Sequence, residues 1–126
     1  MNEGKENIIV KKSYTFALQI IQLYKMLIEK KEYVLSKQIL RSGTSIGANI
    51  HEAVASVSKR DFIHKLSISL KEARETSYWL NLLKDSKYIT NDEFTKLNNS
   101  CDEIIKILNS IILTTKERYF KNIHNS

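Results

Sequence analysis

Residues 40–52 read Leu-Arg-Ser-Gly-Thr-Ser-Ile-Gly-Ala-Asn-Ile-His-Glu, a stretch with helical spacing of apolar residues but little side-chain bulk. Small residues lie on several faces of this predicted helix, and only Arg41, His51 and Glu52 can carry charge. Neighbouring backbones can therefore approach it closely from more than one side. We interpret it as a central helix packed on two sides, the second side facing either another helix of the chain or another copy of the chain.

The composition around this helix favours further long helices. Pro is absent and Gly occurs at only three positions, so residues that break helices are scarce. The 126 residues are the length of one domain. No apolar run approaches the ~20 residues that span a bilayer, and the N-terminal residues lack the apolar segment of a secretory signal. The sequence predicts a soluble, cytoplasmic all-α protein without a membrane partner, and a single cysteine, Cys101, agrees with a reducing compartment.

Four segments show the apolar spacing of helices that pack into a bundle. In the last of them, positions 94, 97, 101, 104, 108, 111 and 115 alternate steps of three and four. Capping motifs mark the starts: Thr90 with Glu93 forms a capping box, Ser58 with Asp61 precedes the third segment, and Ser36 precedes the second. We predict helices at about 11–30, 36–57, 59–85 and 91–120. Their short connections predict one antiparallel, up-down-up-down four-helix bundle over residues 1–126.

This topology predicts specific ion pairs between the second and third helices. Folding them back about Ser58 places Glu75 opposite Arg41, because each is 17 residues from the turn, and places Lys65 near Glu52. An Arg41–Glu75 pair can set the helix register, or it can serve an interface or a ligand. Both interpretations stay open for the candidate structural and interface residues Arg41, Ser45, Ala48, Glu52 and Glu75.

Patterns that resemble catalytic or metal motifs have structural explanations here. Residues 43–47 match G-x-S-x-G, but that motif needs a strained turn between strand and helix, and this stretch is predicted to be helical. A di-iron site in a bundle needs two Glu-x-x-His pairs, and the sequence has none. Cys101 lies at a seam position, where a buried small hydrophobe is expected. We predict no enzyme activity, no metal and no cofactor.

Charge is the remaining functional signal. The formal net charge is +6, and the antiparallel topology gathers basic residues where both termini and the second turn meet. Such a surface can bind nucleic-acid phosphates, although lysine-rich helical surfaces are also common without any ligand. The candidate nucleic-acid-binding residues are Lys11, Lys12, Lys59, Arg60, Lys65, Lys116, Arg118 and Lys121.

Several sequence blocks between residues 13 and 115 carry a family resemblance. They are Ser-Lys-Gln at 36–38, Leu-Arg-Ser-Gly-Thr-Ser-Ile-Gly-Ala-Asn at 40–49, Glu-Ala at 52–53, Ser-Lys-Arg-Asp-Phe at 58–62 and Lys-Glu-Ala-Arg-Glu-Thr-Ser-Tyr-Trp-Leu at 71–80. Together they resemble the four-helix-bundle proteins named after intervening sequences of bacterial 23S ribosomal RNA genes. The resemblance implies a left-handed bundle that assembles as a homopentamer in the bacterial cytoplasm. Related accessory proteins of diversity-generating retroelements are basic pentamers that bind nucleic acid and a reverse transcriptase.

Two functions follow as hypotheses. One is a non-catalytic, oligomeric module that binds RNA or DNA through its basic end, with steep salt dependence and little sequence preference. The other is a scaffold that presents helix faces to a partner protein, with salt-tolerant binding through apolar or aromatic anchors.

Overall fold

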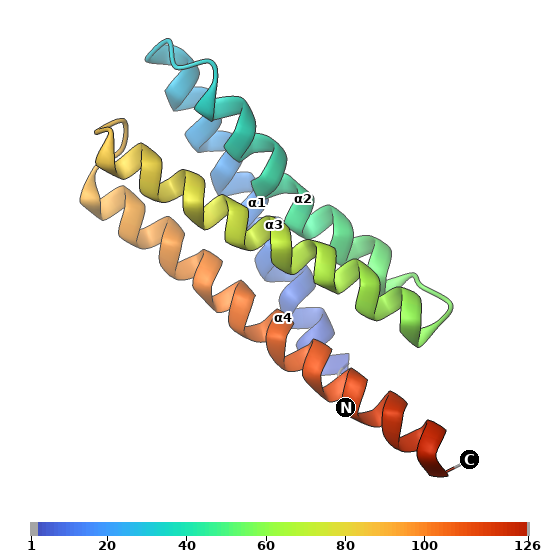
Figure 1. Ribbon diagram of the computed structural model, residues 1–126. Coiled ribbons are helices and arrows are strands. Elements are labelled where there is room, and N and C mark those ends of the chain that lie inside the picture. Colours follow the sequence, from blue (N-terminus) through green and yellow to red (C-terminus); the bar gives the residue numbers. More distant parts are fainter. Residues whose placement is uncertain (1–2, 126) are drawn as a thin grey trace.

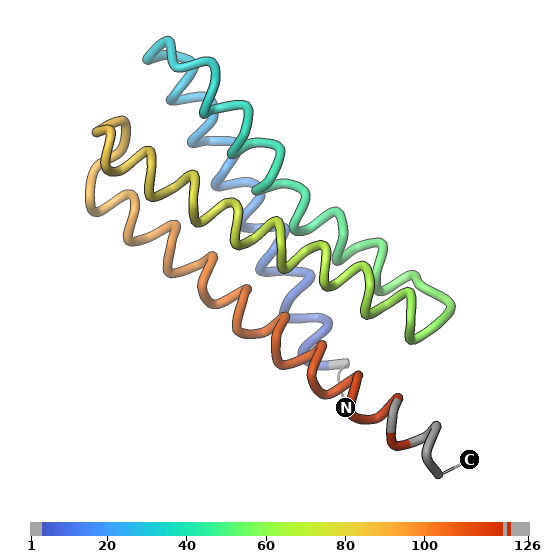
Figure 2. Tube along the Cα trace, in the orientation of Figure 1, coloured from blue at the N-terminus to red at the C-terminus, as the bar shows by residue number. Residues whose placement is uncertain are grey.

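The structure, a computed structural model, describes residues 3–125 (Figure 2), including the side chains of all of these except residues 3, 120 and 122–125. Its four helices are α1 (Glu3–Glu29), α2 (Leu35–Val54), α3 (Lys59–Asp85) and α4 (Asn91–Asn125). Successive helices run in opposite directions, and α1 and α4 close the bundle (Figure 1). Over the described residues, the diagonal pairs α1–α3 and α2–α4 have no Cα atoms within 8 Å of each other. The predicted all-α, up-down-up-down four-helix bundle is confirmed.

The core follows the apolar seams expected from the sequence. Phe16 and Ile20 of α1, Ile46 of α2, Leu80 of α3 and Leu108 of α4 are all at most 1% exposed. The heptad pattern therefore identifies the faces that meet in the centre, where burial of apolar surface supplies the main driving force. Val57, at the end of the range predicted for the second helix, is fully exposed instead of packed, because that helix has already ended at Val54.

The helix boundaries differ from the prediction at three places. The first helix begins at Glu3 rather than at residue 11, since Ile9 packs into the core before the predicted start. The second covers Leu35–Val54 rather than 36–57, because Ala53 is its last buried residue. The fourth extends to Asn125 rather than to residue 120. The third helix matches its predicted range of 59–85.

Two of the predicted caps are confirmed and one is wrong. The Thr90 hydroxyl accepts from the Glu93 N–H at 3.1 Å while the Glu93 carboxylate accepts from the Thr90 N–H at 2.9 Å. The Ser58 hydroxyl accepts from the Asp61 N–H at 3.1 Å. Ser36, however, lies inside α2 with its hydroxyl buried, so it does not cap that helix.

Glu32 caps α2 in place of Ser36. Its carboxylate accepts backbone N–H groups of Val34, Leu35 and Ser36 at 3.2, 2.9 and 2.6 Å, and these are donors that the first turn of a helix leaves without partners. Burial acts to raise the pKa of Glu32, but the hydrogen bonds from Leu35, Ser36 and Val34 outweigh it, so the pKa lies below its ordinary value of 4.5. The charged form therefore stabilises the turn between α1 and α2.

Glu32→Gln is expected to lower the free energy of unfolding by about 1 kcal/mol at neutral pH, the usual contribution of a helix cap. Because the folded-state pKa is lowered, this contribution is present above pH 4.5 and disappears as the pH falls through the folded value. Urea unfolding at pH 7 and at pH 3 measures it. A difference between wild type and variant that is the same at both pH values would contradict the capping role of the carboxylate.

The ends of α1 and α3 share one motif. Lys31 and Lys87 have φ of 64° and 66°, the left-handed conformation usually occupied by glycine. At α1, the N–H of Glu32 donates to the Leu27 carbonyl and the N–H of Lys31 to the Ile28 carbonyl, both at 2.9 Å. This six-to-one and five-to-two pattern is the Schellman motif, which satisfies the last carbonyls of the helix. Because lysine, not glycine, occupies the left-handed position, the ends of these two helices cannot be predicted from the positions of glycine.

Candidate nucleic-acid interface

One end of the bundle gathers the start of α1, the turn between α2 and α3, and the last turns of α4 (Figure 1). Lys59 and Arg60 begin α3 and are exposed, and Lys116 and Lys121 are exposed on α4. Asp61 and Glu117 are the exposed acidic residues beside them. We call Lys59, Arg60, Lys116 and Lys121 the basic end; it presents an excess of positive charge to solvent.

Two of the other predicted phosphate-binding residues, Lys65 and Arg118, are less available to a ligand. The Lys65 ammonium pairs with the Glu52 carboxylate at 3.0 Å, as the sequence predicts, so this lysine is already neutralised. Arg118, on α4, is half-buried. Lys65 and Arg118 therefore add less positive charge to the solvent-facing surface than the sequence alone predicts.

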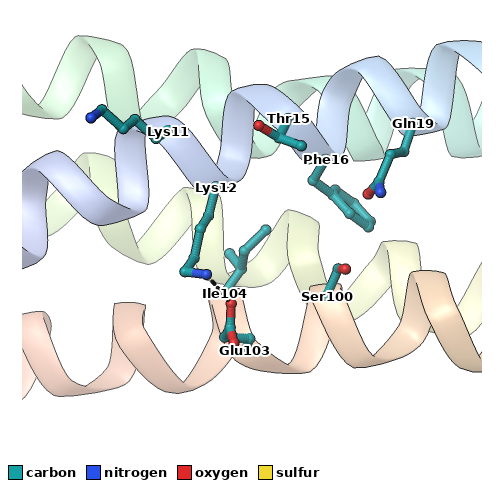
Figure 3. Close-up of a pocket in the computed structure, with 8 residues that line it drawn as sticks. All are labelled: Lys11, Lys12, Thr15, Phe16, Gln19, Ser100, Glu103 and Ile104. Atoms are coloured by element: carbon teal, nitrogen blue, oxygen red, sulfur yellow. Dashed lines mark ion pairs between the residues drawn. The ribbon is translucent and has the colours of Figure 1, made fainter.

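Lys11 and Lys12 lie away from the basic end. Lys12 pairs with Glu103 of α4 at 2.5 Å, as Figure 3 shows, and Glu103 lies twelve residues into that helix. Because α1 begins eight residues earlier than predicted, both lysines lie more than two turns inside the helix, roughly 10 Å beyond Lys5 along the axis. They flank a groove between α1 and α4 instead of the bundle end.

A second charged cluster joins α2 and α3. The Arg41 guanidinium contacts the Glu75 carboxylate, which confirms the predicted pair, and donates to Glu72 Oε2 at 2.9 Å. Glu72 was not predicted, although it precedes Glu75 by one helical turn and so lies on the same face. The Arg41 side chain is 51% exposed and that of Glu72 only 14%. Arg41 is held between two carboxylates of α3, an arrangement that joins the two helices and compensates the charge of the guanidinium.

Buried hydroxyls hold the same two helices together. The Ser69 hydroxyl donates to the Ile46 carbonyl at 2.8 Å, and the Thr76 hydroxyl contacts the Ser42 hydroxyl at 2.9 Å. All three hydroxyl-bearing residues are fully buried. Small side chains allow this close approach, and the hydrogen bonds satisfy polar groups that burial would otherwise penalise. The small residues of α2 thus pack against α3 on this side.

The serine of the G-x-S-x-G match and the single cysteine both make contacts within the helical bundle. Ser45 donates its hydroxyl to the Arg41 carbonyl one turn earlier, at 2.6 Å, inside α2. Cys101 is fully buried and contacts the Ala73 carbonyl at 3.2 Å. Burial, and secondarily the negative charge of Asp102, raises the pKa of the Cys101 thiol to about 12, so the reactive thiolate is absent at neutral pH.

Among residues 3–125, no group of three or more His, Cys, Asp or Glu side chains is placed to hold a metal ion. None of the four helices, over the residues described, combines the length and apolar character needed to cross a membrane. The fold and its surfaces define the class of protein: a four-helix bundle whose prominent surface features, over the residues described, are charged patches and grooves.

The chain belongs to the 23S rRNA-intervening sequence protein family, whose model matches residues 5–110. It is also similar to a crystallised protein from Bacteroides thetaiotaomicron, described as a protein of unknown function from the S23 ribosomal protein family. The two are 57% identical, with a TM-score of 0.85, over 86% of this chain and 97% of the other. No curated protein matches the chain. Neither match indicates a catalytic family.

Proposed function

We propose that this protein is a non-catalytic, cytoplasmic module that assembles as a homopentamer and binds RNA through its basic end. The observation that carries the proposal is the exposed cluster of Lys59, Arg60, Lys116 and Lys121, which gathers positive charge from two helices. Contacts of this kind bind phosphates without reading bases.

Assembly would strengthen such a weak surface. Each copy presents only a few free cations, and affinity for nucleic acid grows with the number of phosphates neutralised. A groove of about 470 Å³ between α1 and α2 is available for contact between copies. It is mostly apolar and includes the exposed Tyr14 together with the small residues Ala17, Gly47 and Ala48. This groove supports oligomerisation through the second side of α2.

The same groove favours a second candidate function, that of a scaffold for a partner protein without direct contact to nucleic acid. Binding through Tyr14 and its apolar surroundings would tolerate salt, since it depends on apolar burial. Binding through the basic end would weaken steeply as salt rises. Salt dependence therefore separates the two functions.

The test is binding of a fluorescein-labelled 20-nucleotide RNA hairpin, measured by anisotropy at 50 and 200 mM salt. The triple variant Lys59→Glu, Arg60→Glu, Lys116→Glu is expected to bind at least tenfold more weakly at 50 mM, because three phosphate contacts are replaced by repulsion. A matched control, Lys25→Glu, Lys37→Glu, Lys96→Glu, changes net charge equally at exposed positions near the other end, and it is expected to stay within about twofold of wild type.

Equal losses in the two triple variants would show that net charge, not the basic end, governs binding. Absence of hairpin binding at 50 mM salt would contradict the RNA function and leave the scaffold. Light scattering on the same samples measures assembly, and a mass of one chain would contradict the pentamer.

A further inference from the structure

The contact between α1 and α4 differs from the tightly joined pair α2 and α3. Here the helices are bridged at the surface by long side chains: Lys12 reaches Glu103 at 2.5 Å, and the Lys5 ammonium donates to the Ser110 hydroxyl at 2.7 Å. Beneath these bridges the surface is hollowed along the boundary between the helices. A surface groove, rather than a closed seam, runs along this side of the bundle.

Two adjoining hollows form what we call the α1–α4 groove. The first, of about 200 Å³, lies around Ile8 and Ile107, with Lys5, Lys106 and Ser110 at its edges. The second, of about 240 Å³, lies between Gln19 of α1 and Ser100 of α4 and has Phe16 and Ile104 at its floor (Figure 3). Ile8 is one turn from Lys12 and Ile107 one turn from Glu103, so the Lys12–Glu103 ion pair lies between the two hollows. Along the axis of α1, Lys5 in the first hollow and Gln19 in the second are roughly 21 Å apart, the length of a four-turn helix.

The first hollow is apolar at its centre and basic at its edges, whereas the second is lined mainly by polar and charged side chains. Ile8 is 47% exposed, so a large aliphatic side chain is open to solvent at the first hollow. Lys5 and Lys106 flank it, while the charge of Glu103 is compensated by Lys12. A ligand that fits must bring aliphatic groups to the isoleucines and negative charge to the lysines.

Nucleic acid fits this groove poorly. Proteins that hold single strands stack bases on exposed aromatic rings, and the ring that lines this groove, Phe16, is 1% exposed. Aliphatic side chains at helical spacing, by contrast, fill such hollows when an amphipathic helix lies in a groove. The edge charges then select a helix whose remaining faces are acidic.

We propose that the α1–α4 groove binds an acidic amphipathic helix of a partner protein. Leucine-like side chains of that helix pack on Ile8 and Ile107, and its carboxylates face Lys5 and Lys106. Polar side chains of the partner meet Gln19 and Ser100 in the second hollow. This interaction is separate from RNA binding at Lys59, Arg60 and Lys116, so either can fail without the other.

The probe is a fluorescein-labelled 15-residue helical peptide with leucine on one face and glutamate on the others, titrated against the full chain at 50 mM salt. It is compared with a peptide in which every glutamate is replaced by lysine. We expect at least tenfold tighter binding of the glutamate peptide. Ile8→Glu should weaken it at least tenfold, whereas Leu18→Glu, at a 48% exposed leucine elsewhere on α1, should leave it unchanged.

Isoleucine methyl NMR spectra of the complex locate the peptide, with the signals of Ile8 and Ile107 expected to shift. Equal affinity for the two peptides, or unchanged binding by Ile8→Glu, would overturn the proposal. So would a 12-nucleotide single-stranded RNA that shifts the same two methyl groups while the peptide does not, which would assign the groove to nucleic acid. Dissociation of an oligomer by Ile8→Glu would assign it to a second copy of this chain.

Discussion

Ile20→Ala is expected to lower the free energy of unfolding by about 2–5 kcal/mol and to make alanine far less costly at Gly43. A Cβ atom at Gly43 would lie 2.8 and 2.9 Å from Cγ1 and Cγ2 of Ile20. Ile20 is fully buried and branched at Cβ, so it has little freedom to move aside. Gly43→Ala alone should therefore destabilise by about 1–3 kcal/mol, partly offset by the better helix propensity of alanine.

A double-mutant cycle with urea unfolding measures this coupling. In the Ile20→Ala background, Gly43→Ala should cost far less than in the wild type, because Cγ1 and Cγ2 of residue 20 are gone and its Cβ, 3.2 Å from the new methyl group, is the close contact that remains. Gly47→Ala is the matched control: its Cβ would lie 3.4 Å from Ser13, an ordinary contact, so up to about 1 kcal/mol of stabilisation is expected. Simple additivity of Ile20→Ala and Gly43→Ala would contradict direct contact between α1 and α2 at this point.

Arg41→Met is expected to destabilise the protein by about 2 kcal/mol. The loss lies between the 0–1 kcal/mol of an exposed ion pair and the 3–5 kcal/mol of a broken buried pair, because Arg41 is half-exposed and Glu72 is largely buried. Without the guanidinium, the carboxylates of Glu72 and Glu75 face each other one turn apart. Thermal unfolding of the variant measures the change.

Two further variants separate the structural role of Arg41 from an interface role. Arg74→Met removes an exposed arginine from α3 and should change stability by less than about 0.5 kcal/mol. Adding Glu72→Gln to Arg41→Met should recover part of the loss, since one unpaired carboxylate is removed. Unchanged stability of Arg41→Met combined with loss of assembly in light scattering would instead assign Arg41 to contacts between subunits.

The sequence predicts the architecture well because its main determinant is local and periodic. Positions 101, 104, 108, 111 and 115 of α4 and positions 39, 43, 46, 50 and 53 of α2 alternate by three and four and are buried in the bundle, while Phe94 and Leu97 of the α4 seam are half-buried. The Arg41–Glu75 and Lys65–Glu52 pairs follow from that periodicity and one turn position, Ser58. Register in an antiparallel helix pair is a matter of counting once the turn is placed.

The remaining features depend on geometry that residue type does not reveal. Glu32 caps α2 from outside the helix, which requires the chain to fold back through the left-handed Lys31. Because α1 starts earlier than predicted, Lys11 and Lys12 lie on the side of the bundle and not at the basic end. The prediction was wrong about the position of these two lysines. The depth of the α1–α4 groove depends on how far two helices separate, which apolar spacing does not specify.

The α2–α3 pair is held together by more buried polar contacts than the α1–α4 pair, so we expect the native state to open first between α1 and α4. Separating α2 from α3 breaks buried hydroxyl hydrogen bonds and the Arg41 cluster, whereas separating α1 from α4 breaks surface lysine contacts. Backbone amides of α2 and α3 are therefore expected to exchange with deuterium only when the whole chain unfolds, and those of α1 and α4 through smaller openings. Brief opening along this side would uncover Phe16 and Ile104 while the rest of the protein stays folded.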